Sequence, residues 1–282
     1  MDILVFGKTG QVATELQRQA RVTALGRDEA DLSDPTACAA AIAHRRPQVV
    51  INAAAYTAVD RAEEEEDLAT CINGRSPGAM AEACRDLTIP FLHISTDYVF
   101  DGTGTAPWRE GDPVAPLGAY GRSKLVGEEA VQTAGGAHAI LRTSWVFSAH
   151  GANFVKTMLR LAETRDHLTV VGDQIGGPTP AADIAATLIA MARAMTEGQP
   201  GGIFHYGGAP AVSWADFARE TFAQAGRSVT VTDIPSSDYP TPAKRPLNSR
   251  LDGAALHAAF GIAPPDWRAG LAAVLADLGA AQ

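Results

Sequence analysis

The sequence predicts an α/β protein built on a doubly wound parallel sheet, followed by a smaller C-terminal α/β domain. Through the first half of the chain, short β-rich runs alternate with helical segments, which is the pattern of right-handed βαβ units. After Trp145 this alternation loosens, and 282 residues are more than one compact domain usually needs. Both observations favour a large sheet domain with a dependent smaller one.

The expected strands are short apolar runs at residues 3–6, 22–25, 49–52, 91–95 and 139–142, with later ones at 168–171 and 203–206. Asp34-Pro35 and Ser76-Pro77 each resemble an N-cap followed by a first-turn proline. Ser213 and Asp216 have the spacing of a capping box. Further helices are expected at about 154–165 and 181–195, and the proline-rich segment 235–250 is expected to be an ordered loop.

Composition excludes several classes of protein. The net charge of −9 argues against broad nucleic-acid binding, and no apolar run is long enough to cross a bilayer. The N-terminus lacks the features of a secretory signal, so we expect a cytoplasmic location. Three cysteines without C-x-x-C spacing predict neither a disulfide scaffold nor a zinc site. The acidic run 63–67 is expected to be a solvated helix face, because consecutive acids point in different directions on a helix.

A glycine-containing turn directly follows the first expected strand. Its sequence is Gly7-Lys8-Thr9-Gly10-Gln11-Val12-Ala13, and a helix is expected to begin near Gln11. Gly7 permits a tight turn, Gly10 lets the backbone approach a pyrophosphate, and the helix N-terminus supplies free N–H groups. In this setting the turn predicts dinucleotide binding on a Rossmann-type domain.

The end of the second expected strand bears on the choice of nicotinamide cofactor. Arg27 suits the 2′-phosphate of NADP, whereas Asp28 leaves NAD open. Arg27 could equally be an ordinary loop cation. NADPH is therefore the favoured cofactor, with NADH as the alternative.

Candidate catalytic residues occur in two later segments. Ser95-Thr96-Asp97 ends an expected strand, at the edge where doubly wound sheets bind ligands. Tyr120 and Lys124 are four residues apart, which places them on one face of a helix. An ammonium group close to the phenol would favour phenolate, and a tyrosine that exchanges a proton near neutral pH needs such help because its usual pKa is about 10.

Together these motifs resemble the extended short-chain dehydrogenase/reductase group, and further strings resemble its dTDP-4-dehydrorhamnose reductase family. The strings are residues 52–60 (NAAAYTAVD), 95–100 (STDYVF), 142–146 (RTSWV) and 245–251 (RPLNSRL). The resemblance runs from residue 3 to about Trp267. It implies reduction of the C4 ketone of dTDP-4-dehydro-L-rhamnose to dTDP-L-rhamnose, in nucleotide-sugar and polysaccharide biosynthesis.

The resemblance also implies roles for individual residues. Tyr120 would be the proton donor, Lys124 its electrostatic partner and a ribose ligand, and Thr96 the group that tunes the proton exchange. The expected cofactor contacts are Gly7, Gly10, Gln11, Val12, Arg27, Asp31, Leu32, Ala55, Tyr56 and Thr57, together with Tyr120 and Lys124. The expected substrate contacts are Thr96, Asp97, Trp145, Asn153, Lys156, Arg245 and Arg250. Guanidinium groups such as Arg245 and Arg250 can grip a diphosphate, although an exposed cationic loop is an equal alternative on composition alone.

The expected domains are a cofactor-binding domain at 1–147 with a return segment near 180–207, and a nucleotide-sugar domain at 148–179 and 208–282. The resemblance further implies a homodimer and a Mg²⁺ ion at its contact, with Glu15 as a weak candidate ligand. First-turn complementarity to the helix dipole is the preferred explanation of Glu15. Two other functions stay open: a nucleotide-sugar epimerase or dehydratase, and a non-catalytic NADP-binding regulatory subunit.

Overall fold

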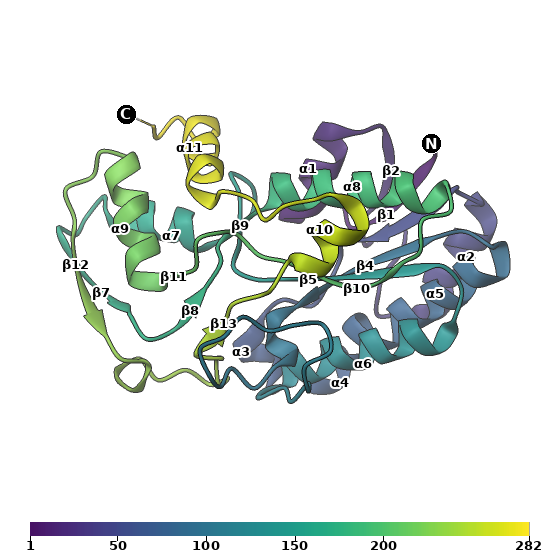
Figure 1. Ribbon diagram of the computed structural model, residues 1–282, viewed down its shortest axis with the longest axis horizontal. Coiled ribbons are helices and arrows are strands. Elements are labelled where there is room, and N and C mark those ends of the chain that lie inside the picture. Colours follow the sequence, from purple (N-terminus) through teal and green to yellow (C-terminus); the bar gives the residue numbers. More distant parts are fainter. Residues whose placement is uncertain (282) are drawn as a thin grey trace.

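The computed structural model describes residues 1–281, and its main layer is a six-stranded parallel sheet (Figure 1). The strands are β1 (Ile3–Phe6), β2 (Val22–Leu25), β3 (Val49–Asn52), β4 (Phe91–Thr96), β5 (His138–Thr143) and β10 (Gly202–Tyr206). Their order across the sheet is β2-β1-β3-β4-β5-β10. Because β2 and β3 flank β1 on opposite sides, the sheet reverses its direction of growth there, which creates the crevice where doubly wound folds bind ligands.

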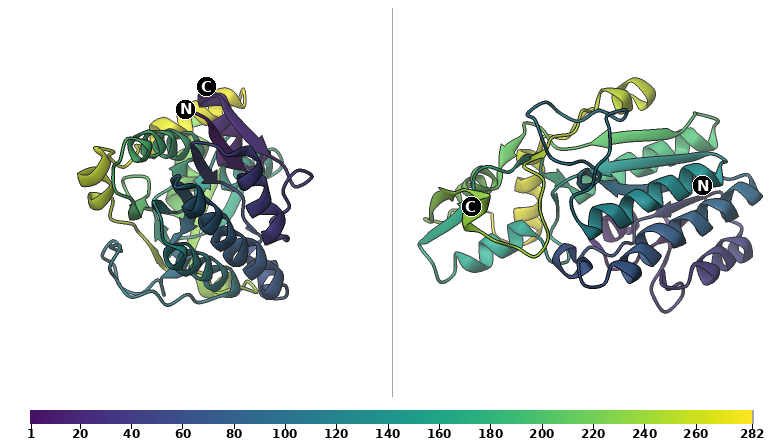
Figure 2. Two further views of the ribbon diagram at one scale, coloured as in Figure 1. Left: turned by 90° about the vertical axis from the view of Figure 1, so that its right-hand side faces the viewer. Right: turned by 90° about the horizontal axis from the view of Figure 1, so that it is seen from below.

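Helices cover both faces of this sheet, as the views in Figures 1 and 2 show. One face carries α1 (Gln11–Gln19), α8 (Ala181–Thr196) and α10 (Ala254–Phe260), and the other carries α2 (Pro35–Arg45), α5 (Ser76–Leu87) and α6 (Ala119–Ala134). Alternation along β1 explains the two layers: Ile3 and Val5 join one hydrophobic core, and Leu4 and Phe6 join the other. Near-continuous burial of the strands is what a sheet covered on both faces requires.

Helix α5 (Ser76–Leu87) begins at Ser76-Pro77, as expected, but Ser76 is not its N-cap. The chain is already helical through α4 (Glu66–Thr70) and a π-helical turn at Cys71–Arg75, which leads directly into α5. Ser76 is buried and donates its hydroxyl hydrogen bond to Leu32 O at 2.6 Å, so it caps nothing. Pro77 has no N–H and its ring crowds the carbonyl four residues earlier, and the wider π turn accommodates both effects.

The acidic run at 63–67 is solvated, as expected, but it does not form one helix face. Short α3 (Val59–Ala62) ends before it, and α4 begins inside it, so the run spans a break between helices. Glu63 accepts the Ala119 N–H at 2.8 Å, Glu65 accepts the Tyr56 hydroxyl at 2.6 Å, and Glu66 pairs with an arginine of α6. These carboxylates fasten neighbouring segments, and Glu63, Glu64 and Asp67 are also exposed to solvent.

The remaining elements gather beyond one end of the sheet (Figure 1). They are α7 (Phe154–Leu161), α9 (Trp214–Gln224), α11 (Trp267–Asp277), β6 (Val146–Phe147), β7 (His167–Val171), β8 (Ile175–Gly176), β9 (Thr179–Pro180), β11 (Val212–Ser213), β12 (Thr230–Ile234) and β13 (Asn248–Ser249). They enclose hydrophobic clusters of their own around Phe217, Trp267 and Phe222. Helix α7 ends at Leu161, earlier than expected, and β12, which pairs with β7, was not anticipated.

Two capping predictions were confirmed. Asp34 accepts the Ala37 N–H at 3.0 Å at the start of α2, and Ser213 accepts the Asp216 N–H at 3.0 Å at the start of α9. Within residues 1–281, no helix combines the length and the apolar character needed to span a bilayer. The three cysteines are unpaired.

Candidate active site

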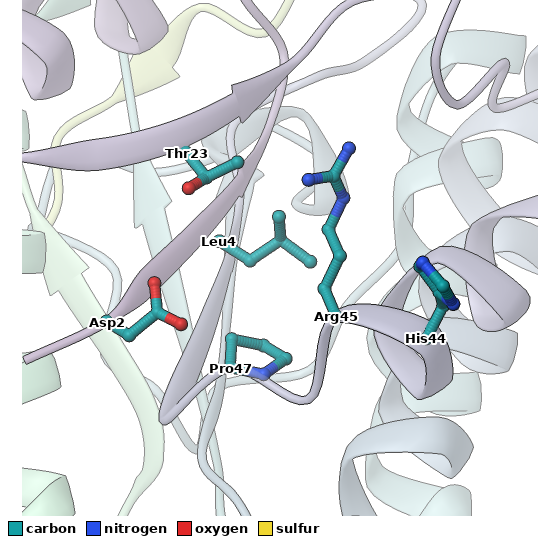
Figure 3. Close-up of a pocket in the computed structure, with 6 residues that line it drawn as sticks. All are labelled: Asp2, Leu4, Thr23, His44, Arg45 and Pro47. Carbon is teal, nitrogen blue, oxygen red and sulfur yellow. The ribbon is translucent and has the colours of Figure 1, made fainter.

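A cleft of about 880 Å³ opens at the carboxyl ends of the central strands. It is lined by the turn after β1, the segments after β2, β3, β4 and β5, and one face of α6. A smaller pocket lies at the opposite edge, near the amino ends of β1 and β2, and is lined by Asp2, Leu4, Thr23, His44, Arg45 and Pro47 (Figure 3). Doubly wound folds bind ligands at carboxyl strand ends, so the large cleft is the candidate site.

The glycine turn forms one wall of this cleft, as expected. Gly7 has φ +107°, a conformation that side chains disfavour, and a Cβ there would lie 3.3 Å from the backbone of Ala53 and Ala54. Gly10 is the N-cap of α1, and a Cβ there would meet nothing within 4 Å. The protein itself therefore does not require glycine at position 10, and the open space fits a ligand that approaches the backbone. No acidic side chain lies in the first turn of α1 to oppose an anion.

The segment after β2 forms the far end of the cleft. Arg27 and Leu32 line it, and the Arg27 side chain is exposed. Asp31 is not among the lining residues, and its carboxylate accepts the Ser33 N–H at 2.8 Å, which lowers the pKa of Asp31. Arg27 and Leu32 therefore lie at the cleft as expected, whereas the Asp31 carboxylate is hydrogen-bonded within its own loop.

Ala55, Tyr56 and Thr57 line the middle of the cleft, and Asn73 holds their backbone in place. Its Oδ1 accepts the Tyr56 N–H at 2.8 Å and its Nδ2 donates to Tyr56 O at 3.0 Å. The same amide donates to Ser123 Oγ on α6 at 2.9 Å. Asn73 lies in the π turn, and nothing in the local sequence pattern signalled it, because its partners are 17 and 50 residues away.

Thr96 ends β4 and Asp97 begins the 3-10 turn that follows, and both are buried inside the cleft. Thr96 Oγ1 donates to Asp97 Oδ1 at 3.1 Å, whereas Asp97 Oδ2 has no hydrogen-bond partner in the described structure. Burial raises the pKa of Asp97 to about 6, although the neighbouring Ser249 and Thr96 hydroxyls lower it. Ser95 Oγ and Thr143 Oγ1, also at the cleft, are likewise buried without partners. Unpaired buried polar atoms are costly, and their concentration here marks a polar ligand site.

Tyr120 and Lys124 both line the cleft from α6, as their spacing predicts. Burial raises the pKa of Tyr120 to about 12, and the neighbouring Thr96 hydroxyl only partly opposes this. Lys124 Nζ donates to Ile94 O at 2.7 Å and contacts His93 Nε2 at 3.2 Å. The expected lowering of the Tyr120 pKa by Lys124 does not occur in this structure, because the amine is held at β4 and burial dominates.

The surroundings of Lys124 also explain its own protonation. Burial lowers the pKa of Lys124 to about 8, while the carboxylate of Glu128 acts in the opposite direction. His93 is fully buried, and burial and the Lys124 charge lower its pKa well below the usual range. Its Nδ1 contacts the Asn52 amide nitrogen at 3.1 Å, and Asn52 Oδ1 accepts the Ala54 N–H. His93 and Asn52 were missed because strand interiors give no sign of such partners.

Trp145 lines the cleft directly after β5. The other four predicted substrate contacts do not line it, and each has a partner within the chain. Asn153 caps α7 and donates to Gln11, Lys156 donates to Ala149 O, Arg245 forms a two-bond pair with Asp60, and Arg250 donates to Asn248. Their roles stay predictions that require these side chains to exchange partners.

Glu15 does not lie in the first turn of α1, so the expected dipole explanation was wrong. Its carboxylate contacts Arg18 at 3.2 Å and His150 at 3.1 Å. Within residues 1–281 there is no group of three or more potential metal ligands. The residues around Glu15 therefore do not fit a Mg²⁺ site, since one carboxylate paired with a cation is a poor ligand set.

Comparison with known proteins agrees with this geometry. A family model described as the RmlD substrate binding domain matches residues 1–280. A dTDP-4-dehydrorhamnose reductase of Sinorhizobium fredii is 46% identical over 278 residues, covering 95% of this chain and 94% of the relative. The reductase of Escherichia coli K12 is 41% identical over 295 residues, covering 99% and 98%.

Solved structures give the same result. A crystal structure of a dTDP-4-dehydrorhamnose reductase from Clostridium acetobutylicum has a TM-score of 0.92 and 37% identity, covering 99% of this chain and 100% of that one. The reductase of Bacillus anthracis in complex with NADP has a TM-score of 0.92 and 31% identity, covering 98% and 99%. The family model and full-length relatives confirm the resemblance, and the chain belongs to the dTDP-4-dehydrorhamnose reductase family.

Proposed function

We propose that this protein reduces the C4 ketone of dTDP-4-dehydro-L-rhamnose to the hydroxyl of dTDP-L-rhamnose, with NADPH as cofactor. The observation that carries the proposal is the convergence of Thr96, Tyr120 and Lys124 on one cleft with the glycine turn. Family membership supports the reaction class, since a fold alone does not determine activity.

The cleft fits a nicotinamide dinucleotide. Gly7, Gly10, Gln11 and Val12 would hold the pyrophosphate at the N-terminus of α1, and Arg27 would meet the 2′-phosphate. Ala55, Tyr56 and Thr57 would contact the middle of the cofactor. When bound, NADPH supplies the hydride. The exposed Arg27 favours NADPH over NADH, and the NADP complex of the Bacillus anthracis relative agrees with that preference.

The chain's own residues supply the proton and the orientation. Tyr120 donates its phenolic proton to the oxygen that was the ketone, and the neighbouring Thr96 hydroxyl, which lowers the pKa of that phenol, would orient it. A phenol with a pKa of about 12 keeps its proton at neutral pH, as a donor must. Lys124 lies one turn along α6 and would bind the cofactor ribose, the other role that the resemblance implies. Asp97 and Trp145 would contact the sugar.

We also propose the two domains that the sequence predicted, each with its own ligand. Residues 1–147 with 180–207 would bind the cofactor, and 148–179 with 208–282 would bind the nucleotide sugar. The separate hydrophobic clusters around the six-stranded sheet and around Trp267 support this division. A cytoplasmic location is proposed as well, because three unpaired cysteines suit a reducing compartment. The homodimer implied by the resemblance stays a prediction.

Absorbance of NADPH tests the proposed reaction. With dTDP-4-dehydro-L-rhamnose, we expect one NADPH to be oxidised per sugar, with NADH slower and dTDP-glucose inert because it has no ketone. Sugar conversion without net NADPH oxidation would indicate an epimerase or dehydratase instead. Tight NADPH binding with no conversion of any sugar would indicate a regulatory subunit.

A further inference from the structure

Trp145 is held in an unusual backbone conformation at the cleft wall. Its φ of +49° places a bulky residue in the left-handed region, which costs on the order of 1–3 kcal/mol and persists only where the surroundings impose it. Its carbonyl accepts the Thr179 N–H at 3.1 Å, which ties the strained residue to the segment that leads into α8. The strain therefore points to an orientation of the indole that matters.

Two neighbours confine the Trp145 indole. A Cβ at Gly176 would lie 2.7 Å from Trp145 Cε2, so only glycine at position 176 leaves room for the ring. The indole of Trp214 stacks on that of Trp145, with ring centroids 3.6 Å apart and an interplanar angle of 10°. Stacked aromatic pairs contribute on the order of 0.5–1.5 kcal/mol beyond their burial, enough to select one orientation of a side chain.

Trp214 is itself fixed. Its Nε1 donates to Gln174 Oε1 at 3.1 Å, and Gln174, which is 8% exposed, donates to Ser236 Oγ at 3.0 Å. Phe154 packs on the same indole, with centroids 4.6 Å apart. Trp214 begins α9 and does not line the cleft. Its direct contact with a residue of the cleft wall is the stack on Trp145.

We propose that Trp214 is a positioning residue for the nucleotide-sugar substrate: it holds the Trp145 indole as a preformed wall of the sugar end of the cleft. This inference rests on the proposed function, in which Trp145 contacts the sugar. Because the indole is already ordered, substrate binding does not carry the entropic cost of immobilising a large side chain. Binding of the cofactor, at the glycine turn, does not depend on it.

Kinetics of Trp214→Ala and Trp214→Phe test the proposal. In Trp214→Ala, KM for the keto sugar should rise about two- to tenfold, which corresponds to the ordering of one side chain, while the Kd for NADPH stays within twofold. Trp214→Phe retains a flat ring and should lie between wild type and the alanine variant. Circular dichroism should show a coupled-indole signal in wild type that Trp214→Ala and Trp145→Phe both lose.

Phe222→Leu is the matched control. Phe222 is buried about two turns along α9 from Trp214, and within the described residues its ring pairs with neither Trp214 nor Trp145. It should lose stability and keep the wild-type KM for the sugar. An unchanged sugar KM in Trp214→Ala, or an equal rise in Phe222→Leu, would overturn the positioning role.

Failure of the proposed function can be distinguished from failure of the positioning role. If Trp145→Ala also leaves sugar affinity unchanged, Trp145 is not a substrate contact and both its role and that of Trp214 are lost. If wild type reduces no keto sugar, calorimetry with dTDP-L-rhamnose on the same variants still decides the positioning role. Weaker binding in Trp214→Ala but not in Phe222→Leu would support it, and equal binding would refute it.

Discussion

Burial and the negative charge of Asp97 both raise the pKa of Tyr120, and only the Thr96 hydroxyl opposes them. Burial raises the pKa of its phenol to about 12, so the group holds a proton that only a developing alkoxide, a much stronger base, can take. Lys124, whose pKa burial lowers to about 8, is one turn away on α6. Tyr120 therefore rests as a protonated phenol, ready to donate, rather than as a phenolate.

Tyr120→Phe removes this donor with little change in shape. We expect turnover to fall by about two to four orders of magnitude, the usual contribution of a positioned acid, with the NADPH Kd nearly unchanged. Tyr98→Phe is the control, because its ring contacts Tyr120 edge-on, with centroids 5.4 Å apart. Steady-state rates and a fluorescence titration measure both effects, and wild-type turnover in Tyr120→Phe would remove it from the mechanism.

Asp97 shows that this site is assembled at a cost in stability. Its pKa is raised from 3.8 to about 6, so the native state binds the proton more tightly than the unfolded state, and the ionised carboxylate destabilises the fold above pH 6. Asp97→Asn should raise the free energy of unfolding by about 3 kcal/mol at pH 8, and by about half of that at pH 5. It should also weaken sugar reduction.

Urea unfolding of Asp97→Asn at the two pH values measures this gain. Asp101→Asn is the opposite control, because bonds from the Thr103 N–H and hydroxyl lower the pKa of Asp101, and their loss should destabilise the fold at pH 8. A gain in stability that is the same at pH 8 and pH 5 would contradict ionisation as its cause.

Among the elements, the π turn at Cys71–Arg75 does most to connect the cleft to the rest of the fold. It carries Asn73, which bonds both backbone groups of Tyr56 and reaches Ser123 on α6. The turn lies tightly against α6, since a Cβ at Gly127 would be 2.1 Å from Asn73 O. A regular α-helix here would point the side chain of residue 73 in another direction, away from Tyr56.

Asn73→Ala leaves the backbone groups of Tyr56 without partners. We expect a loss of about 2–3 kcal/mol in the free energy of unfolding, the usual cost of unsatisfied buried polar groups, and a severalfold rise in the NADPH Kd. Ser123→Ala removes only the link to α6 and should lose less stability with the NADPH Kd preserved. Equal NADPH binding in Asn73→Ala and wild type would mean that the Tyr56 segment holds its shape unaided.

The elements also show how far the sequence could lead. The strands of the main sheet were predicted closely, because continuous apolar runs and the glycine turn are local signals. The cleft residues Thr96, Tyr120 and Lys124 followed from strand ends and helical spacing. The π turn did not, since Ser76-Pro77 imitates a capped helix start and the wider turn depends on packing against α6. Asn73 and His93 were invisible for the same reason: their partners are distant in sequence.

At the scale of the molecule, a buried polar network lies behind the cleft. Glu128 of α6 pairs with Arg142 of β5 at 2.6 Å, and Arg142 contacts His205 Nε2 of β10 at 3.3 Å. Because the guanidinium donates to Nε2, the proton of His205 is on Nδ1, which donates to Trp108 O at 2.9 Å. Burial and the Arg142 charge lower the pKa of His205 to about 4.

This network predicts acid sensitivity. His205 has a pKa of about 4 when folded and 6.5 as the reference for the unfolded chain, so its neutral form stabilises the native state above pH 6.5, and this stability is lost as pH falls toward 4. From pH 7.5 to pH 5 the group should remove about 2 kcal/mol, a loss that His205→Asn should avoid. Urea unfolding at both pH values measures it, with the exposed His257→Asn as control. Identical pH dependence in wild type and His205→Asn would exclude His205 as the source.

The return of β10 to the main sheet has a consequence for synthesis of the protein on the ribosome. Strand β10 pairs with β5 only after the chain has built β6 to β9 elsewhere, so the edge of β5, complete at Thr143, stays bare until Tyr206 emerges. At about 5–20 residues per second that interval lasts several seconds. A nascent chain with an open, apolar strand edge is vulnerable to pairing with its neighbours on a polysome, and slow codons between these two points would lengthen the exposure.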